Sequence, residues 1–319
     1  MEPLVSKYVP HVLLHLLSLA PSQYCQAYFT ILGLGCVGLQ LLPSLQDALL
    51  NYGARKAAAG DSTATGGTTE ESLLVTLLRK LGLLTRVPHS WFVHFYVALL
   101  CLQAFWAVQF VTHGRILTTI AEREVASGGG GGMTLGQVVL VWVMLSIQGA
   151  RRLYECLVIM KPSASPMLAV HWVLSFLVYV FMSISIWVEG SASIINVSLA
   201  DANLAPPFHT LFPFISFVVA SRQQQEAHKH LASLKKYTLP TQGLFSNIVC
   251  PHYTCECLIY VGLAAAAAPR GHVFNPTLLC ALFFVVANLG ATANNTKRWY
   301  VEKFGAAKVP RWRMILFIF

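Results

Sequence analysis

Long apolar runs, separated by short polar clusters, dominate the chain. A helix that crosses a bilayer needs about 20 mostly apolar residues. The runs that approach or reach this length lie near 25–45, 91–112, 135–158, 166–188, 207–221, 254–268 and 274–293. Backbone groups within lipid must be hydrogen-bonded inside their own segment, so each run predicts a helix. The expected fold class is therefore all-α, a polytopic membrane bundle of about seven transmembrane helices.

The pattern divides the chain into a leading segment and one membrane domain. Residues 1–24 contain an apolar run at 9–21 that two prolines interrupt, which predicts a lumenal, interfacial or re-entrant segment. Residues 25–319 form the predicted membrane domain, with a cytosolic tail from about 294 to 319. The start of the chain lacks the pattern of a removable signal peptide.

Composition and charge support a membrane protein and orient it. The chain is 55% hydrophobic and 11% charged, with a net charge of +9. If the chain crosses the bilayer at every run, the side that holds its N-terminus receives four basic residues: Lys7, Arg115, Arg123 and Arg270. The opposite side receives the other Lys and Arg residues, so the positive-inside rule makes that side cytosolic. No basic stripe with interleaved aromatics indicates a nucleic-acid partner.

A polar group opens the sixth apolar run, in the sequence CPHYTCE at 250–256. If a helix starts after Pro251, His252 and Glu256 lie one turn apart, and Tyr253 shares their face. A helix start leaves N–H donors free and favours an anionic ligand. The simpler interpretation is a capped helix entry with an interfacial aromatic residue. The cysteines in this segment match no zinc spacing, so we expect no metal site.

A second polar group follows the fifth run, in SRQQQEAHKHLASLKK at 221–236. Gln224, His228 and Lys235 are spaced by four and seven residues, which predicts one stripe of a helix. Amide, imidazole and ammonium groups can hold phosphates and ribose hydroxyls. The alternative is an ordinary solvated basic helix end.

Two further groups lie at the ends of the third and seventh runs. Arg151 and Glu155 are positioned to pair at i and i+4, beside Arg152, so a structural ion pair is one interpretation. Lys297 and Tyr300 share a face of the tail, for which a basic amphipathic surface segment is the alternative. Together the four groups place cations and hydrogen-bonding side chains at the cytosolic ends of several runs. This arrangement suits an anionic, phosphate-bearing cofactor that enters from the cytosol.

The order of these motifs resembles the steroid 5α-reductase family, and most closely its polyprenol (polyprenal) reductase branch. The resemblance runs from about residue 45 to residue 319. Its most specific parts are the P-H-Y-x-x-E block at 251–256 and the final triplet Phe317-Ile-Phe319. The sequence RRLYE at 151–155 favours the polyprenol branch.

This resemblance implies an NADPH-dependent enzyme of the endoplasmic reticulum membrane that saturates a carbon–carbon double bond conjugated to a carbonyl. For this branch the implied reaction reduces the α-isoprene unit of polyprenal or polyprenol toward dolichol, which supports dolichol-linked N-glycosylation. Its partners are the isoprenoid lipid substrate and the bilayer. The cofactor contacts implied by position are Gln224, His228, Lys235, His252, Tyr253, Glu256, Lys297, Arg298 and Tyr300. The implied substrate-cavity residues are Tyr52, Trp91 and Tyr96.

The chain departs from the steroid-reducing members at their acid pair. Those members use a glutamate and a tyrosine where this sequence carries Phe95 and Gly149. The catalytic candidates that remain are His94, then Tyr154, with Glu155 beside it and Tyr96 beside His94. Steroid 3-oxo-4-ene reduction and an isoprenylcysteine-type methyltransferase that binds S-adenosylmethionine remain the alternative functions. A transporter is disfavoured because the sequence shows no inverted repeat.

Overall fold

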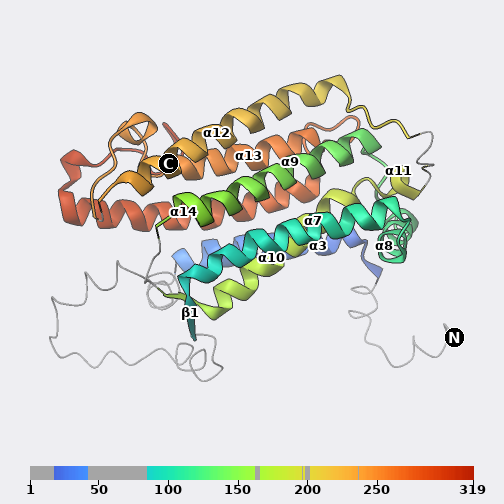
Figure 1. The fold of residues 1–319 in the computed structure, drawn as a ribbon, viewed down its shortest axis with the longest axis horizontal. Helices are drawn as coiled ribbons and strands as arrows, with labels where there is room; N and C mark the ends of the chain where they lie inside the picture. Colours follow the sequence, from blue (N-terminus) through green and yellow to red (C-terminus); the bar gives the residue numbers. More distant parts are fainter. Residues whose placement is uncertain (1–17, 42–84, 162–165, 196, 198–201, 236) are drawn as a thin grey trace.

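The computed structural model describes residues 18–41, 85–161, 166–195, 197, 202–235 and 237–319. Within these ranges the chain is mainly helical, as Figure 1 shows. Tyr52 and residues 1–17 lie outside the described residues.

Every predicted apolar run overlaps with one long helix of the bundle. These helices are α3 (Pro21–Gln40), α7 (Val93–Val111), α9 (Leu135–Tyr154), α10 (Ala169–Val188), α12 (Leu211–Ser233), α13 (Pro251–Ala266) and α14 (Pro276–Phe304). The all-α fold class is therefore confirmed. Among the described residues, length and composition are sufficient for a membrane span in three segments: His89–Val111, α10 and α14.

Short elements connect the long helices. Helix α8 (Arg115–Ala126) follows α7, and α11 (Ser191–Ile195) follows α10. Strands β1 (Arg86–Pro88) and β2 (Pro166–Leu168) pair in an antiparallel ribbon. In the chain, β1 precedes α7 and β2 precedes α10. A π-helical turn, η2 (Glu155–Ile159), continues α9. The remaining short turns are η1 (His89–Phe92), η3 (Phe208–Thr210), η4 (Gly243–Ser246) and η5 (Ala306–Lys308).

Several helix boundaries differ from the sequence prediction. Helix α3 begins at Pro21, so the domain boundary predicted at residue 24 falls inside a helix. Proline is favoured at the first helical position because its missing N–H has no intrahelical partner there. At the other end of the chain, α14 continues to Phe304, so the first part of the predicted tail is helical.

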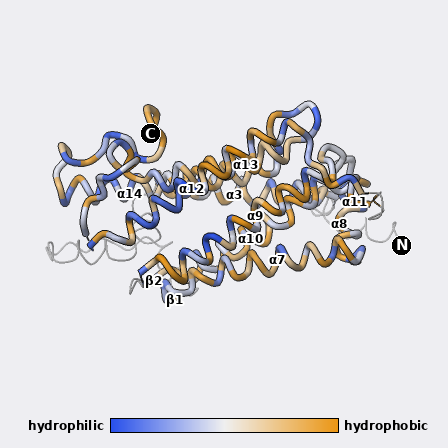
Figure 2. Tube along the Cα trace, turned by 45° about the horizontal axis from the view of Figure 1, so that its top comes forward, coloured by the Kyte–Doolittle hydropathy of each residue, from blue (hydrophilic) through white to orange (hydrophobic). Residues whose placement is uncertain are grey.

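The helices pack in neighbouring pairs around one apolar core. Helix α12 lies along α13, α14 lies along α3, and α9 packs on both α7 and α13. Figure 2 shows hydrophobic residues along the middle of the helices and hydrophilic residues mostly toward their ends. This distribution is the one a bilayer requires of a bundle that crosses it.

A glycine sets the distance between α12 and α13. A Cβ atom at Gly262 would lie 3.1 Å from both the Cβ of Phe217 and the carbonyl oxygen of Pro213. Small residues at such contacts let two helices approach closely, which is a common way to gain packing energy within lipid.

We expect Gly262→Val to separate α12 from α13 and to lower the free energy of unfolding by about 1–3 kcal/mol, the usual cost of overpacking. Gly38→Val is the matched control, because nothing lies within 4 Å of a Cβ atom built at Gly38 on α3. Thermal unfolding of the detergent-solubilised protein measures both effects. Equal stability of the two variants would show that the contact at Gly262 is not tight.

Candidate active site

A buried carboxylate, that of Glu155, lies where α9 passes into the π-helical turn η2. Its side chain has no solvent exposure, and both of its oxygens accept hydrogen bonds from guanidinium groups. Arg151 Nη1 donates to Oε1 and Arg152 Nη1 donates to Oε2. His228 of α12 places Nδ1 2.7 Å from Oε2. π-Helical turns often occur at functional sites, and this turn carries the central acid of the cluster.

A second carboxylate, that of Glu256, joins the cluster from α13. Gln224 of α12 donates to Glu256 Oε2 and also to the carbonyl oxygen of His252, at 3.2 Å. Gln148 of α9 donates to Gln224 Oε1 at 3.2 Å and lies 3.4 Å from Glu256 Oε2. Arg151 Nη2 donates to Gln148 Oε1 at 2.9 Å and to Gln224 Oε1. These bonds connect α9, α12 and α13 in one network.

Tyr96 brings α7 into the same network. Arg152 Nε donates to the Tyr96 hydroxyl oxygen at 3.1 Å, and the guanidinium carbon lies 5.1 Å from the centre of the Tyr96 ring. The ring itself is buried and packs on Phe92 and Tyr179. Because Arg152 occupies a lone pair of the hydroxyl oxygen, the hydroxyl proton of Tyr96 remains available to another acceptor.

His228 and His252 lie on one side of this network. Their ring centres are 5.6 Å apart, and His252 also lies 4.2 Å from the ring of Tyr253. His228 follows the apolar part of α12, and burial lowers its pKa, an effect that hydrogen bonding to Glu155 offsets only in part. Its Nδ1 lies 2.8 Å from Arg152 Nη1 as well as 2.7 Å from Glu155 Oε2, so its tautomer determines which group it bonds.

We call this network of side chains the ionic cluster, and its charges balance one another. Its members are Tyr96, Gln148, Arg151, Arg152, Glu155, Gln224, His228, His252 and Glu256. Two carboxylates, Glu155 and Glu256, are matched by the guanidinium groups of Arg151 and Arg152. Ionised side chains at membrane depth are costly and persist where they pair or carry function. The cluster is therefore a group of polar and charged side chains within an apolar bundle, at the end that holds the C-terminus in Figure 1.

The structure brings together six of the residues that the sequence nominated: Tyr96, Glu155, Gln224, His228, His252 and Glu256. Tyr253 lies at the margin of this group through its contact with His252. The i, i+4 pairing of Arg151 with Glu155 is also confirmed, as one part of a larger network.

The other nominated catalytic side chains lie outside the ionic cluster. His94 is exposed, with its ring 5.5 Å from that of Trp91 and 6.1 Å from that of Trp172. Tyr154 is 51% exposed, although it directly precedes the buried Glu155. On a helix, successive residues are about 100° apart, so neighbours in sequence face different surroundings.

The predicted stripe on α12 is shorter than its spacing indicates. Gln224 and His228 face the cluster, but α12 ends at Ser233, and Lys235 lies exposed beyond the helix. The extension of the stripe to Lys235 is thus wrong, because the helical period does not continue past the last turn.

The C-terminal segment folds back instead of lying apart as a tail. Val249 N donates to Trp312 O and Cys250 N donates to Arg313 O, each at 2.9 Å, so the segment pairs with the entry to α13. Lys297 donates to the carbonyl oxygen of Arg311, which also connects the segment to α14.

The last two nominated residues of α14 lie apart from the ionic cluster in different ways. Arg298 is exposed, and Tyr300 packs among the rings of Trp299 and Phe304.

Sequence reasoning missed two participants. Gln148 was not nominated, although it precedes Arg151 by three residues and Arg152 by four, which places it one turn away on α9. Arg152 was noted only as a neighbour of the ion pair, whereas it links Glu155 to Tyr96. Helical spacing could have indicated Gln148, but the contact between α7 and α9 has no local sequence signal.

Comparison with known proteins shows which family this arrangement is similar to. A family model described as 3-oxo-5-alpha-steroid 4-dehydrogenase matches residues 165–319. This part of the chain is therefore similar to the steroid 5α-reductase family. The matched part contains α10, α12, α13 and α14, and therefore the half of the ionic cluster formed by Gln224, His228, His252 and Glu256. The half carried by α7 and α9 precedes it.

Individual relatives share a more specific name. The polyprenal reductase of Saccharomyces cerevisiae is 33% identical over 180 residues, which cover 56% of this chain and 64% of that protein. Polyprenal reductase 2 of Oryza sativa subsp. japonica is 25% identical over 284 residues, 73% of this chain and 79% of the relative. The polyprenal reductase of Caenorhabditis elegans is 26% identical over 256 residues, with coverage of 72% and 78%. The matched stretch thus spans less than two thirds of the yeast relative.

These findings confirm the resemblance to the polyprenal reductase branch. The family consists of oxidoreductases that act on a CH–CH bond and generally use a nicotinamide cofactor.

Removing the central carboxylate should destabilise the bundle. We expect Glu155→Gln to lower the free energy of unfolding by about 3–5 kcal/mol, because it leaves two buried guanidinium groups without their counter-charge. The matched control is Glu226→Gln, which breaks an exposed ion pair with Lys229 at 3.0 Å and should cost at most about 1 kcal/mol. Chemical unfolding monitored by tryptophan fluorescence compares them, and equal losses would contradict a structural role for the cluster.

Proposed function

We propose that this chain reduces the α-isoprene double bond of polyprenal with NADPH, the step that leads toward dolichol and supports dolichol-linked N-glycosylation. The observation that carries the proposal is the ionic cluster, which connects the buried Tyr96 to Arg152 at one end of an apolar bundle. Yeast, rice and nematode relatives named polyprenal reductase support the choice of substrate. We infer the endoplasmic reticulum membrane from the resemblance to polyprenal reductases, and a cytosolic C-terminus from the charge asymmetry.

The residues around the cluster fit a dinucleotide. Among the described residues, His252 Nδ1 and Arg151 Nε are buried and have no hydrogen-bond partner, so each offers a polar atom to a ligand. Lys235 and Arg298 are exposed at the same end, where the ring of Tyr237 lies 5.9 Å from that of Trp299. Cations of this kind favour pyrophosphate and the 2′-phosphate that distinguishes NADPH from NADH.

The remaining nominated cofactor residues belong to the same proposal. The ribose and nicotinamide of the cofactor would be held by Gln224, His228, Tyr253 and Glu256. Helix α14 would stabilise this part of the site through Lys297 and Tyr300. When bound, a reduced nicotinamide supplies the hydride.

The chemistry assigned to this chain is the stabilisation of charge. Addition of hydride to the β-carbon of an enal moves negative charge onto the aldehyde oxygen, and a preorganised donor at that oxygen lowers the barrier. The Tyr96 hydroxyl is our first assignment for this donor, because Arg152 fixes its orientation and leaves its proton free to be donated. His94, Tyr154 and Glu155 remain the other assignments, with Glu155 acting through the two arginines.

The substrate class follows from the need for a group that accepts this negative charge. An allylic alcohol has no carbonyl to accept the charge, whereas polyprenal has one. The positions of the steroid-type acid pair hold apolar residues: Phe95 is buried against Phe92 and Tyr179, and Gly149 faces Leu99. These features favour an isoprenoid enal over a steroid enone. The apolar bundle also offers a long isoprenoid chain an apolar environment that continues into the surrounding lipid.

Product analysis tests the proposed reaction. Purified protein with polyprenal and NADPH should yield the α-saturated aldehyde, with NADH supporting a slower reaction because it lacks the 2′-phosphate. Polyprenol in the absence of an oxidant should not react, since it lacks an electron sink. Chromatography with mass spectrometry distinguishes these products.

The controls of this assay separate the competing functions. Saturation of the alcohol without any aldehyde would overturn the assignment of polyprenal, and turnover of a steroid 3-oxo-4-ene would support the steroid alternative. Stabilisation of the protein by S-adenosylmethionine, but not by NADPH, would instead indicate a methyltransferase, because a ligand stabilises the state that binds it.

Substitution of the assigned donor tests the mechanism. Tyr96→Phe keeps the ring but removes the hydroxyl, and should lower kcat by about 10²–10³-fold with little change in NADPH affinity. Tyr24→Phe, on α3 at the other end of the bundle, is the matched control. His94→Ala is measured in parallel, and a larger loss of kcat in that variant than in Tyr96→Phe would assign the donor to His94.

A further inference from the structure

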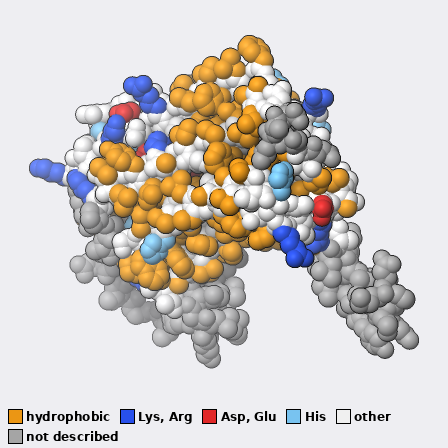
Figure 3. All heavy atoms as spheres, turned by 45° about the vertical axis from the view of Figure 1, so that its right-hand side comes forward, with side chains coloured by type: hydrophobic (Ala, Val, Ile, Leu, Met, Phe, Trp, Pro, Cys, Tyr) orange, Lys and Arg blue, Asp and Glu red, His pale blue; other side chains and the backbone are white. Residues whose placement is uncertain are grey.

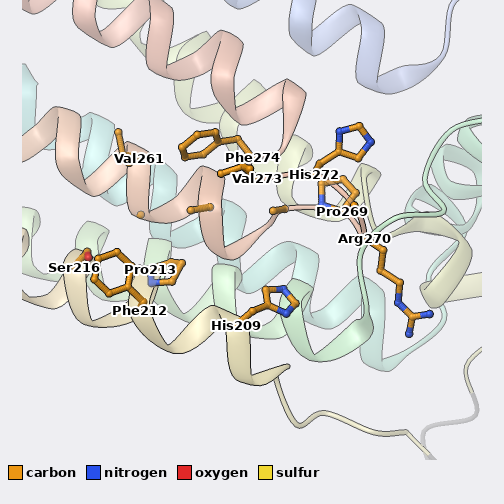
Figure 4. Close-up of a pocket in the computed structure, with 14 residues that line it drawn as sticks. His209, Phe212, Pro213, Ser216, Val261, Pro269, Arg270, His272, Val273 and Phe274 are labelled. Carbon is orange, nitrogen blue, oxygen red and sulfur yellow. The ribbon is translucent and has the colours of Figure 1, made fainter.

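A cavity of about 610 Å³ opens between α12 and α13, at the end of the bundle opposite to the ionic cluster. It lies between the first turns of α12, the last turns of α13 and the loop that leads to α14, as Figure 4 shows. Ligand pockets commonly occupy about 300–1,000 Å³. The cavity is therefore large enough for part of a lipid chain.

The lining of this cavity is polarised along the helices. His209, Arg270 and His272 lie toward the end where the helices meet the connecting loop, and Ser216 and Val261 lie toward the middle of the bundle (Figure 4). The cavity thus has basic and imidazole groups at one end and mainly apolar walls at the other. An amphipathic molecule aligned with the helices has the same polarity.

Arg270 provides an unpaired positive charge. It is exposed and forms no salt bridge with any described residue, and none of the residues that line the cavity is acidic. A guanidinium group with free donors binds phosphate in a bidentate manner. The charge at this end of the cavity is therefore complementary to an anionic head group.

The mouth of the cavity is apolar and faces outward. Phe212 is 78% exposed and Val273 is 74% exposed, and both line the cavity. Figure 3, in which the right-hand side of Figure 1 is turned forward, shows hydrophobic side chains over much of the surface, with charged side chains toward the edges. A water-soluble anion gains nothing from such a mouth, whereas a lipid replaces one apolar surface with another.

The walls are preformed. Gln137 of α9 donates to the carbonyl oxygens of Ala266 and Ala268, at 3.0 and 2.9 Å, and so fixes the end of α13. Arg270 N donates to Gly132 O at 3.2 Å, and His272 N donates to Pro269 O at 3.0 Å. A loop held by its own backbone bonds presents its side chains to a ligand with little further ordering.

We propose that this cavity binds a phospholipid of the bilayer whose head group is anionic, with the head group at Arg270 and His272 and one chain directed toward Val261. The site is separate from the proposed reduction site, because it lies at the opposite ends of the same two helices. The bound lipid would belong to the leaflet on the side of the membrane opposite to the proposed cofactor site.

Cross-linking in nanodiscs tests this proposal with the full chain. Photoactivatable phosphatidic acid should label peptides within 209–216 and 261–274, and unlabelled phosphatidic acid should compete about fivefold better than phosphatidylcholine, the preference expected for one basic residue near a membrane surface. Arg270→Gln should abolish this preference. Arg115→Gln is the matched control, because Arg115 is an exposed arginine at the same end on α8 and does not line the cavity.

A second variant separates the chain site from the head-group site. Ala265→Phe places a large side chain in the cavity and should reduce labelling by photoactivatable phosphatidic acid without changing the ratio in which the two unlabelled lipids compete. Equal competition by the two lipids with the unaltered protein, or labelling confined to other peptides, would overturn the proposal. Competition by inorganic phosphate as effective as that by phosphatidic acid would show that a soluble anion, and not a lipid, occupies the site.

Discussion

The pairing of Glu155 with two arginines and a histidine is the interaction on which this end of the bundle depends. A carboxylate without solvent exposure is tolerated only where opposite charge and hydrogen-bond donors surround it. Since Arg151 also bonds Gln224 and Arg152 also bonds Tyr96, neutralising one acid fixes α9 against both α12 and α7. The bonds that stabilise this buried charge thus also position side chains from different helices, which apolar packing alone does not do.

That constraint links architecture to chemistry. A donor that stabilises a developing negative charge is effective when it is held in place before the reaction and shielded from water. Tyr96 meets both conditions through its buried ring and its bond to Arg152. The C-terminal segment, which pairs with the entry to α13, holds His252 at the edge of the same site. For the proposed reduction of an isoprenoid enal, the fold thus places the assigned donor before a cofactor and a substrate bind.

Helices α12 and α13 serve both ends of the molecule. The ionic cluster occupies one end and the polarised cavity the other, and Gly262, at the close contact of the two helices, forms part of the cavity wall. Polar side chains of the chain itself fill the space between the two helices at the first end, while the cavity at the other end is open.

The sequence by itself determined the helices, the family resemblance and the local ion pair of Arg151 with Glu155, since apolar run length, short motifs and i, i+4 spacing are properties of residues close in sequence. Only the tertiary structure decided that Tyr96 faces the ionic cluster while His94 faces outward beside Trp91 and Trp172. The physical reason is that α7 is apolar on all sides: lipid and protein core accept the same side chains, so hydrophobic periodicity does not indicate which face is buried. The return of the C-terminal segment onto α13 was equally invisible, because backbone pairing between distant segments leaves no pattern along the chain.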